Sequence, residues 1–123
     1  MALFKLGRIS ENDQYISIAV RMAIAMKENI EKYPASFSNW ALLWMFISKP
    51  FYEIVICGNK AQDFAFKISK LLYPGKIALW NNATGTLPVF NNRFKAGQTL
   101  IYICSEKVCH KPVASVEEAT ELL

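Results

Sequence analysis

The segment between Pro34 and Pro50 most constrains what this chain can fold into. It contains the run FSNWALLWMFIS, residues 37–48, in which apolar side chains fall on nearly every side of a helix. A proline at each end limits the helix, because proline and the residue before it resist helical geometry. A helix that is apolar all round has to be covered on every side. We therefore expect it to belong to a larger helical body than one amphipathic partner can supply.

The residues before Pro34 predict that one partner. Gly7 is typical of a helix end, and Ser10 can cap the next helix with Asp13 three positions later. Apolar residues then recur at intervals of three and four as far as Tyr33, which predicts an amphipathic helix of about six turns.

The pattern changes after Pro50, where strand and helix signals alternate. The runs YEIVICG (52–58) and KIALWN (76–81) predict strands on either side of a helix that Asn59 can cap. This arrangement is a β-α-β unit, which has parallel strands. The remaining predicted elements are a turn-rich loop with one helical turn near 87–90, a third strand at 99–105, a short fourth strand at 107–113 and a closing helix at 115–123 with a capping box of Ser115 and Glu118.

These patterns together predict an α/β (α+β) fold. An N-terminal helical hairpin over residues 1–50 is followed by a small α/β domain over residues 51–123. We expect that domain to hold a three- to four-stranded, mostly parallel sheet with flanking helices.

Charge and hydropathy exclude several classes of partner. The chain has 14 basic and 10 acidic residues, and its basic residues are scattered, whereas a nucleic-acid groove requires clustered positive charge. The longest uncharged helical run, residues 33–48, is shorter than the roughly 20 apolar residues of a spanning helix. The N-terminal MALFKLGRIS lacks the apolar core of a signal peptide, and three cysteines do not fit a fully paired secreted scaffold. We expect a cytoplasmic protein that binds neither nucleic acid nor membrane.

The stretch YICSEKVCHKP, residues 102–112, holds two of the three cysteines and the only histidine. If it forms a hairpin with Glu106 and Lys107 at the turn, Cys104 faces Cys109 in a non-hydrogen-bonded pair. Their Cα atoms would then lie about 4.5 Å apart, within bridging range. A reversible disulfide would make this stretch a redox module. The alternative is two reduced thiols, and Glu-Lys is a poor sequence for a tight hairpin turn.

A metal site in this stretch is incomplete. Cys104, Cys109 and His110 are three potential ligands, whereas structural zinc sites have four, and neighbouring strand residues point to opposite faces. A nucleophilic pair of Cys109 and His110 is weak for the same reason. Cys57 ends a β-branched run and is expected in the core. We expect no metal and no cofactor.

Gly58, Asn59 and Lys60 form a third, weaker candidate. They lie where a strand meets a helix, and a helix N-terminus can hold an anion such as a nucleotide or sugar phosphate. The sequence GNKAQDF lacks both glycine-rich phosphate-loop motifs, and Asp63 would repel an anion.

The cysteine stretch also carries a family resemblance. Tyr102, Ile103, Cys104, Cys109 and Pro112 match the pattern Y-[VI]-C-x4-C-x-x-P. With the upstream residues 15–50, this pattern resembles the C-terminal region of the large thioredoxin-domain-containing proteins of the spermatogenesis-associated type. The resemblance implies the last hairpin of a six-hairpin, glycosidase-like α/α toroid followed by a small α/β tail.

The resemblance also shapes the expected function. The family's thioredoxin-like C-x-x-C motif and central toroid acids have no counterpart in these residues, so we expect no enzymatic activity from this chain alone. It would be a structural or interaction piece whose partner is the rest of the parent polypeptide. By itself, the chain is expected to form a homo-oligomer through Trp40, Trp44 and Phe46.

Overall fold

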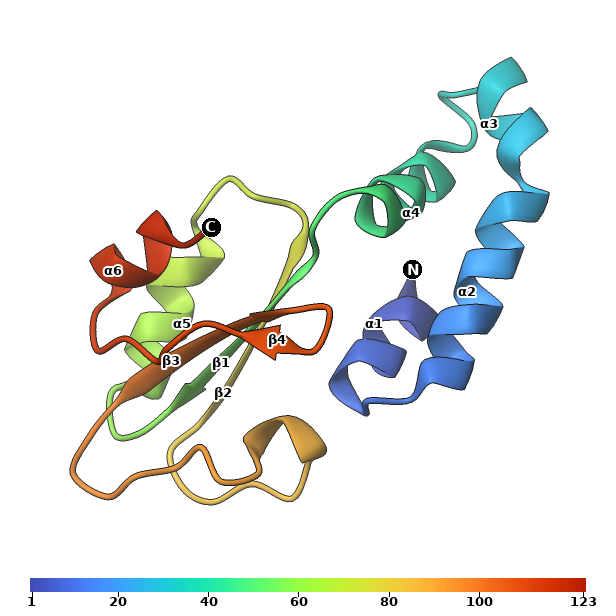
Figure 1. Ribbon diagram of the computed structural model, residues 1–123. Coiled ribbons are helices and arrows are strands. Elements are labelled where there is room, and N and C mark those ends of the chain that lie inside the picture. The colour runs from blue at the N-terminus through green and yellow to red at the C-terminus, as the bar shows by residue number, and fades with distance from the viewer. The chain divides into compact units, whose positions relative to one another are not determined.

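The computed structural model describes residues 1–123 as two compact units (Figure 1). The helical unit comprises Met1–Pro50, and the α/β unit comprises Phe51–Leu123. The predicted α/β class, with helices at the N-terminus, is confirmed. None of the helices combines the length and the apolar character that crossing a lipid bilayer requires.

The helical unit consists of short helices joined by tight turns. They are α1 (Ala2–Ile9), α2 (Asp13–Ala25), α3 (Lys27–Lys32) and α4 (Ser38–Ser48). Asn12, rather than the predicted Ser10, caps α2, because its side-chain oxygen accepts from the amides of Gln14 and Tyr15 at 3.0 and 3.4 Å. Ser10 instead follows the end of α1, where its hydroxyl donates to the Leu6 carbonyl at 2.8 Å.

Gly7 lies inside α1, which corrects the predicted helix end. A Cβ atom on Gly7 would lie 2.7 Å from Cγ1 of Ile16 and 3.1 Å from the carbonyl oxygen of Asn12. Glycine is therefore required here because α1 and α2 approach closely, and not because the helix stops.

The predicted six-turn helix is interrupted at Met26, which separates α2 from α3. In a continuous helix the Ala23 carbonyl would accept from the amide of Lys27. Instead it accepts from the indole nitrogen of Trp44 at 2.9 Å and from the Met26 amide at 3.1 Å. A side chain that enters the backbone ladder is a known cause of such breaks. The interruption thus depends on a residue in α4.

α4 buries part of its apolar surface within the helical unit. Leu43 and Phe46 are buried, and the ring of Phe46 packs against Phe4 with 6.4 Å between ring centroids. Phe46 therefore offers no surface for the expected self-association, because Phe4 covers it. Trp40 and Trp44 are half-buried and keep part of their surface.

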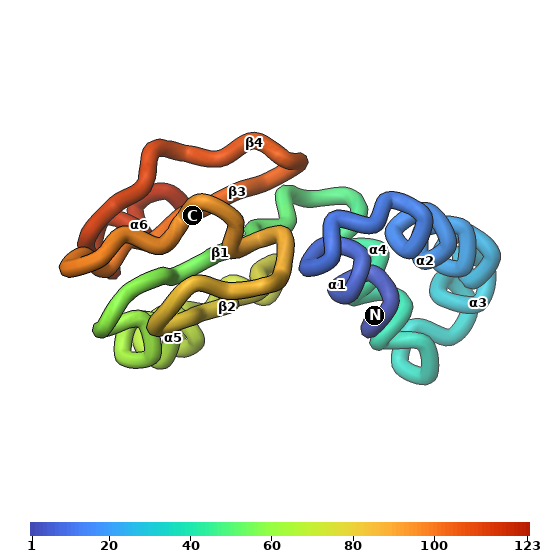
Figure 2. Tube along the Cα trace, turned by 90° about the horizontal axis from the view of Figure 1, so that it is seen from below, coloured from blue at the N-terminus to red at the C-terminus, as the bar shows by residue number.

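The α/β unit is built on a sheet with the strand order β2-β1-β3-β4, which can be followed in Figure 2. Its elements are β1 (Tyr52–Cys57), α5 (Ala61–Ser69), β2 (Lys76–Asn81), the 3₁₀ turn η1 (Pro88–Phe90), β3 (Leu100–Ser105), β4 (Val108–Cys109) and α6 (Val116–Glu121). β1 and β2 are parallel, as predicted, whereas β3 is antiparallel to both β1 and β4. The sheet is therefore mixed and not mostly parallel. β3 is reached through a long loop without a crossover helix, so nothing forces it to run parallel.

The two faces of the sheet have separate cores. Because successive strand residues point to opposite faces, the central strand β1 contributes to both. α5 and α6 cover one face of the sheet (Figure 1), and isoleucines of β1 and β3 form the core there with residues of the two helices. On the other face, Val55 and Cys57 pack with Val89 and Phe90 of the β2–β3 loop. That loop therefore acts as the cover for the second face.

α6 begins at the predicted capping box. The Ser115 hydroxyl accepts from the Glu118 amide at 3.2 Å, and the Glu118 carboxylate accepts from the Ala114 amide at 3.3 Å. These two bonds fix the start of a helix whose Val116 and Ala119 join the core of the first face.

Candidate functional site: a hairpin disulfide beside an arginine

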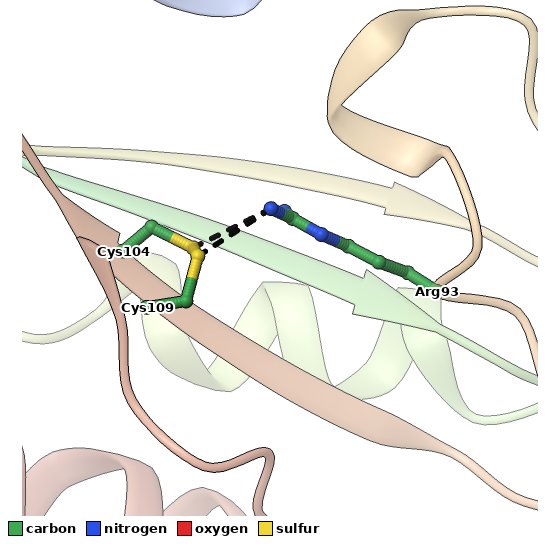
Figure 3. Close-up of a disulfide and its surroundings, with 3 residues drawn as sticks. All are labelled: Arg93, Cys104 and Cys109. Atoms are coloured by element: carbon green, nitrogen blue, oxygen red, sulfur yellow. Dashed lines mark hydrogen bonds between the residues drawn. A yellow bond between two sulfur atoms is a disulfide. The ribbon is translucent and has the colours of Figure 1, made fainter. Parts of the chain in front are cut away.

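Cys104 and Cys109 face each other across the β3–β4 hairpin. The His110 amide donates to the Ile103 carbonyl at 2.9 Å, so those two residues form the hydrogen-bonded pair of the ladder. Cys104 and Cys109 are therefore the closer, non-hydrogen-bonded pair, with 3.9 Å between their Cα atoms. This is the predicted register, and the two sulfur atoms are joined in a disulfide of 2.02 Å (Figure 3).

The hairpin turns through Glu106 and Lys107, although their sequence is a poor one for a tight turn. Both residues have positive φ, 51° and 66°. Such a turn matches the twist of the strands but favours Asn-Gly, because a left-handed L-residue costs about 1–2 kcal/mol. The adjacent disulfide keeps the two strands together next to this unfavourable turn.

Arg93 of the β2–β3 loop points its guanidinium at the disulfide (Figure 3). One terminal nitrogen of Arg93 donates to the sulfur atoms of both Cys104 and Cys109, at 3.5 Å each. Tyr102 holds the other end of the residue, because its hydroxyl donates to the Arg93 carbonyl at 2.8 Å. The guanidinium carbon also lies 5.4 Å from the centre of the Tyr102 ring, within range of a cation–π contact.

Cys57 and Tyr102 show that the Arg93 charge acts on this face of the sheet. Burial raises the pKa of the Cys57 thiol, and the positive charge of Arg93 offsets part of that rise. Burial also raises the pKa of Tyr102, with a further rise from Cys57 and an opposing effect of Arg93. Cys57 is a free thiol that is 1% exposed, so its predicted place in the core is confirmed.

The two cysteines of the disulfide differ in exposure. Cys104 is the last residue but one of β3 and is only 2% exposed. Cys109 is exposed on the edge strand, and its neighbour Val108 is 73% exposed. A reagent from solution therefore meets the Cys109 side of the bond first.

His110 takes no part in this cluster. Its backbone amide bonds to Ile103, and its side chain is exposed. The structure holds no group of three or more His, Cys, Asp or Glu side chains that could bind a metal ion.

The third predicted candidate borders a cavity of about 350 Å³ at the start of α5. Asn59 and Lys60 line it, together with residues of the β2–β3 loop. Lys60, not the predicted Asn59, takes the N-cap position of α5 and makes no side-chain capping hydrogen bond. Its amide donates to the Thr99 hydroxyl at 3.1 Å. Gly58 has a φ of 133°, and a Cβ atom there would overlap the backbone at Thr99. Gly58 thus allows β1 and the loop to meet at the edge of the cavity.

Sequence reasoning did not name Arg93, and it named Tyr102 only as part of the family pattern and not as a neighbour of the disulfide. Tyr102 carried a usable signal, because it lies two positions before Cys104 on a strand and therefore shares its face. Arg93 carried none, since it lies in an irregular loop whose path over the sheet no local pattern defines.

Comparison of the chain with protein-family models, with curated proteins and with solved structures finds no match.

Proposed function

We propose that this chain is a structural, non-catalytic piece of a larger protein. In this proposal the helical unit is the last hairpin of an α/α toroid, and the α/β unit is a cap that braces the parent. The resemblance of residues 102–112 to the C-terminal pattern of the thioredoxin-domain-containing proteins supports it. The observation that carries it is the apolar surface of the helical unit.

The helical unit leaves four large apolar residues exposed. Leu6 and Met22 are 49% and 48% exposed, and Ile24 and Tyr33 are 56% and 61% exposed. Single apolar residues are normal on a protein surface, whereas a contiguous apolar patch marks an interaction site, and we propose that these four side chains contribute to such a patch. The half-buried Trp40 adds to this set.

The test is the association state of the isolated chain. Without its parent, the chain is expected to cover this surface by self-association, with a mass in light scattering that rises with concentration. Ile24→Glu should shift the molecule towards monomer, because it places a charge on the contact surface. Leu72→Glu is the matched control, since Leu72 is a fully exposed apolar residue of the other unit. A monodisperse wild-type monomer at high concentration would contradict the proposal.

A second candidate function is the binding of a small phosphorylated molecule at the start of α5. The cavity there falls within the 300–1,000 Å³ typical of ligand sites and is bordered by Asn59 and Lys60. A thermal-shift screen with nucleotides and sugar phosphates tests it. The expected result is a rise in melting temperature that Lys60→Met abolishes and the control Lys67→Met preserves. An unchanged melting temperature across the screen rejects this candidate.

A further inference from the structure

We infer that the Cys104–Cys109 disulfide is an exchange site for a low-molecular-weight thiol, and that Arg93 holds the sulfur that leaves. This inference goes beyond the proposed structural role. It rests on three observations: Cys109 is an exposed residue, Cys104 is a buried one, and one cation contacts the sulfur atoms of both.

Accessibility decides which sulfur is attacked. Exchange proceeds by attack of a thiolate on one sulfur of a disulfide, through a mixed disulfide. Cys109 is exposed on the short edge strand β4, whereas Cys104 is 2% exposed. The incoming thiolate therefore reaches Cys109, and Cys104 is the leaving sulfur.

The reaction balances with two equivalents of a small thiol such as glutathione. The first thiolate bonds to Cys109 and breaks the Cys104–Cys109 bond, whose electron pair leaves on Cys104 as a thiolate. The second thiolate attacks the sulfur of the first, forms the oxidised small disulfide, and releases Cys109 as a thiolate that takes up a proton. The protein disulfide is reduced by two electrons and the two small thiols are oxidised. Oxidation by the small disulfide is the same sequence in reverse.

Arg93 favours this route through its contact with the leaving sulfur. Its N–H donates to both sulfurs at 3.5 Å in the disulfide form. When Cys104 becomes a thiolate, the same hydrogen bond joins a cation to an anion, which makes it stronger than the bond to the uncharged sulfur of the disulfide. A better-stabilised leaving thiolate departs faster. Tyr102 keeps Arg93 in place from both the backbone and the ring.

The other ionisable groups around the sulfurs do not supply this positive charge. Glu53 lies opposite Cys104 in the register of β1 and β3, so its carboxylate disfavours a thiolate there. Cys57 and Tyr102 both have raised pKa values and are neutral at pH 7. Glu106 and Lys107 at the turn and His110 directly after β4 are exposed. Arg93 is the cation whose hydrogen bonds reach both sulfurs.

The test uses the oxidised full-length chain with an excess of glutathione, in the wild type and in Arg93→Met. Methionine keeps much of the packing volume of the arginine stem but removes the charge. The rate of reduction should fall about threefold, as expected for a leaving thiolate whose stabilisation changes tenfold. The rate at which iodoacetamide alkylates the reduced pair depends on pH. The pH at which this rate reaches half of its maximum should be about one unit higher in the variant. Lys95→Met, an exposed change in the same loop, should behave as the wild type.

Mapping the trapped mixed disulfide supplies an independent readout. The glutathione adduct is expected on Cys109, and an adduct on Cys104 overturns the assignment of the leaving sulfur. Unchanged rates and alkylation profiles in Arg93→Met overturn the role of Arg93. If Arg93→Met fails to fold, Arg93→Lys takes its place, with a smaller shift expected because lysine keeps the charge but not the guanidinium geometry. Wild-type protein that gives no adduct and no reduction overturns the exchange site itself, and leaves the light-scattering test of the structural proposal unaffected.

Discussion

The α/β unit and the helical unit bury their apolar residues to very different extents. Of the twenty buried apolar residues, fifteen belong to the α/β unit and five to the helical unit. Those of the α/β unit are mainly isoleucine, valine and phenylalanine, whereas two of the five in the helical unit are alanine. Each large buried side chain contributes about 1.5–3 kcal/mol. The α/β unit therefore has a core of its own, and the helical unit has little.

The comparison teaches that apolar content and apolar burial are separate properties. The run in α4 is the most apolar of the chain, yet Leu43 and Phe46 are its only buried residues. In contrast, β1 buries its last four residues, Ile54 to Cys57, because helices cover one face and the β2–β3 loop covers the other. A sequence gains stability from apolar residues only where the fold provides a second layer to cover them.

Dividing the chain at residue 50 should give the largest effect. The peptide of residues 51–123 is expected to fold alone, because both faces of its sheet are covered from within. The peptide of residues 1–50 is expected to stay largely unfolded, because so little of it is buried. Dispersion of amide signals in two-dimensional NMR spectra of the two peptides measures this. A well-dispersed spectrum from residues 1–50 would contradict the comparison.

Trp44→Phe tests the bond that joins α4 to the end of α2. The change removes the indole N–H that donates to the Ala23 carbonyl and should destabilise the helical unit by about 1–2 kcal/mol. Helical content from circular dichroism against urea measures the loss. Trp40→Phe is the matched control, since it removes an indole of similar burial from the same helix. Equal losses in the two variants would count against the role of the hydrogen bond.

A turn substitution should stabilise the α/β unit by a smaller amount. Glu106→Asn with Lys107→Gly places favoured residues at two positions of positive φ, and we expect a gain of about 1 kcal/mol. The midpoint of chemical unfolding, followed with the disulfide reduced, checks it. Asn91→Gly serves as a control, since the φ of Asn91 is −57° and glycine brings no such gain there. A loss of stability at the hairpin would show that the turn is not of this type.

Alkaline pH should destabilise the α/β unit, and this is the smallest of the expected effects. Burial raises the pKa of Cys57 and of Tyr102, so the folded α/β unit resists their ionisation. A group whose pKa is raised in the folded state contributes its full stabilisation below its unfolded-state pKa, which is roughly 8.5 for cysteine and 10 for tyrosine. That stabilisation is lost as the pH rises through the folded-state pKa. The unfolding midpoint should therefore fall above about pH 9, and fall less steeply in Cys57→Ala. Parallel profiles in the two proteins would refute the contribution of Cys57.

Local patterns predicted most of the elements of the fold. The β-branched run that ends at Gly58 and the run that starts at Lys76 became β1 and β2, and the capping box at Ser115 became the start of α6. Each of these signals lies within the element that it defines. The Cys104–Cys109 register was also predictable, because a two-residue turn fixes the pairs on either side of it.

The cap errors at Ser10 and Asn59 are local, off by one or two residues, whereas the larger errors involve contacts between different elements. The helix break at Met26 depends on Trp44 of α4. Gly7 leaves room for Ile16 of the next helix. The direction of β3 depends on the long irregular loop before it. Arg93 belongs to that same loop, so its approach to the disulfide could not be predicted. The pairing of Cys104 with Cys109 across the hairpin was accordingly predictable, and the residues around the disulfide were not.

The bond between Tyr102 and Arg93 has a consequence for how this surface can change. The Tyr102 hydroxyl donates to the backbone carbonyl of residue 93, which every amino acid possesses. The loop is therefore anchored whatever side chain stands there, and the charge facing the disulfide can be altered without loosening the cover of the sheet. At position 93 the side chain contacts the disulfide, whereas the backbone carbonyl anchors the loop. A substitution there can therefore change the charge beside the disulfide and keep the bond that holds the loop.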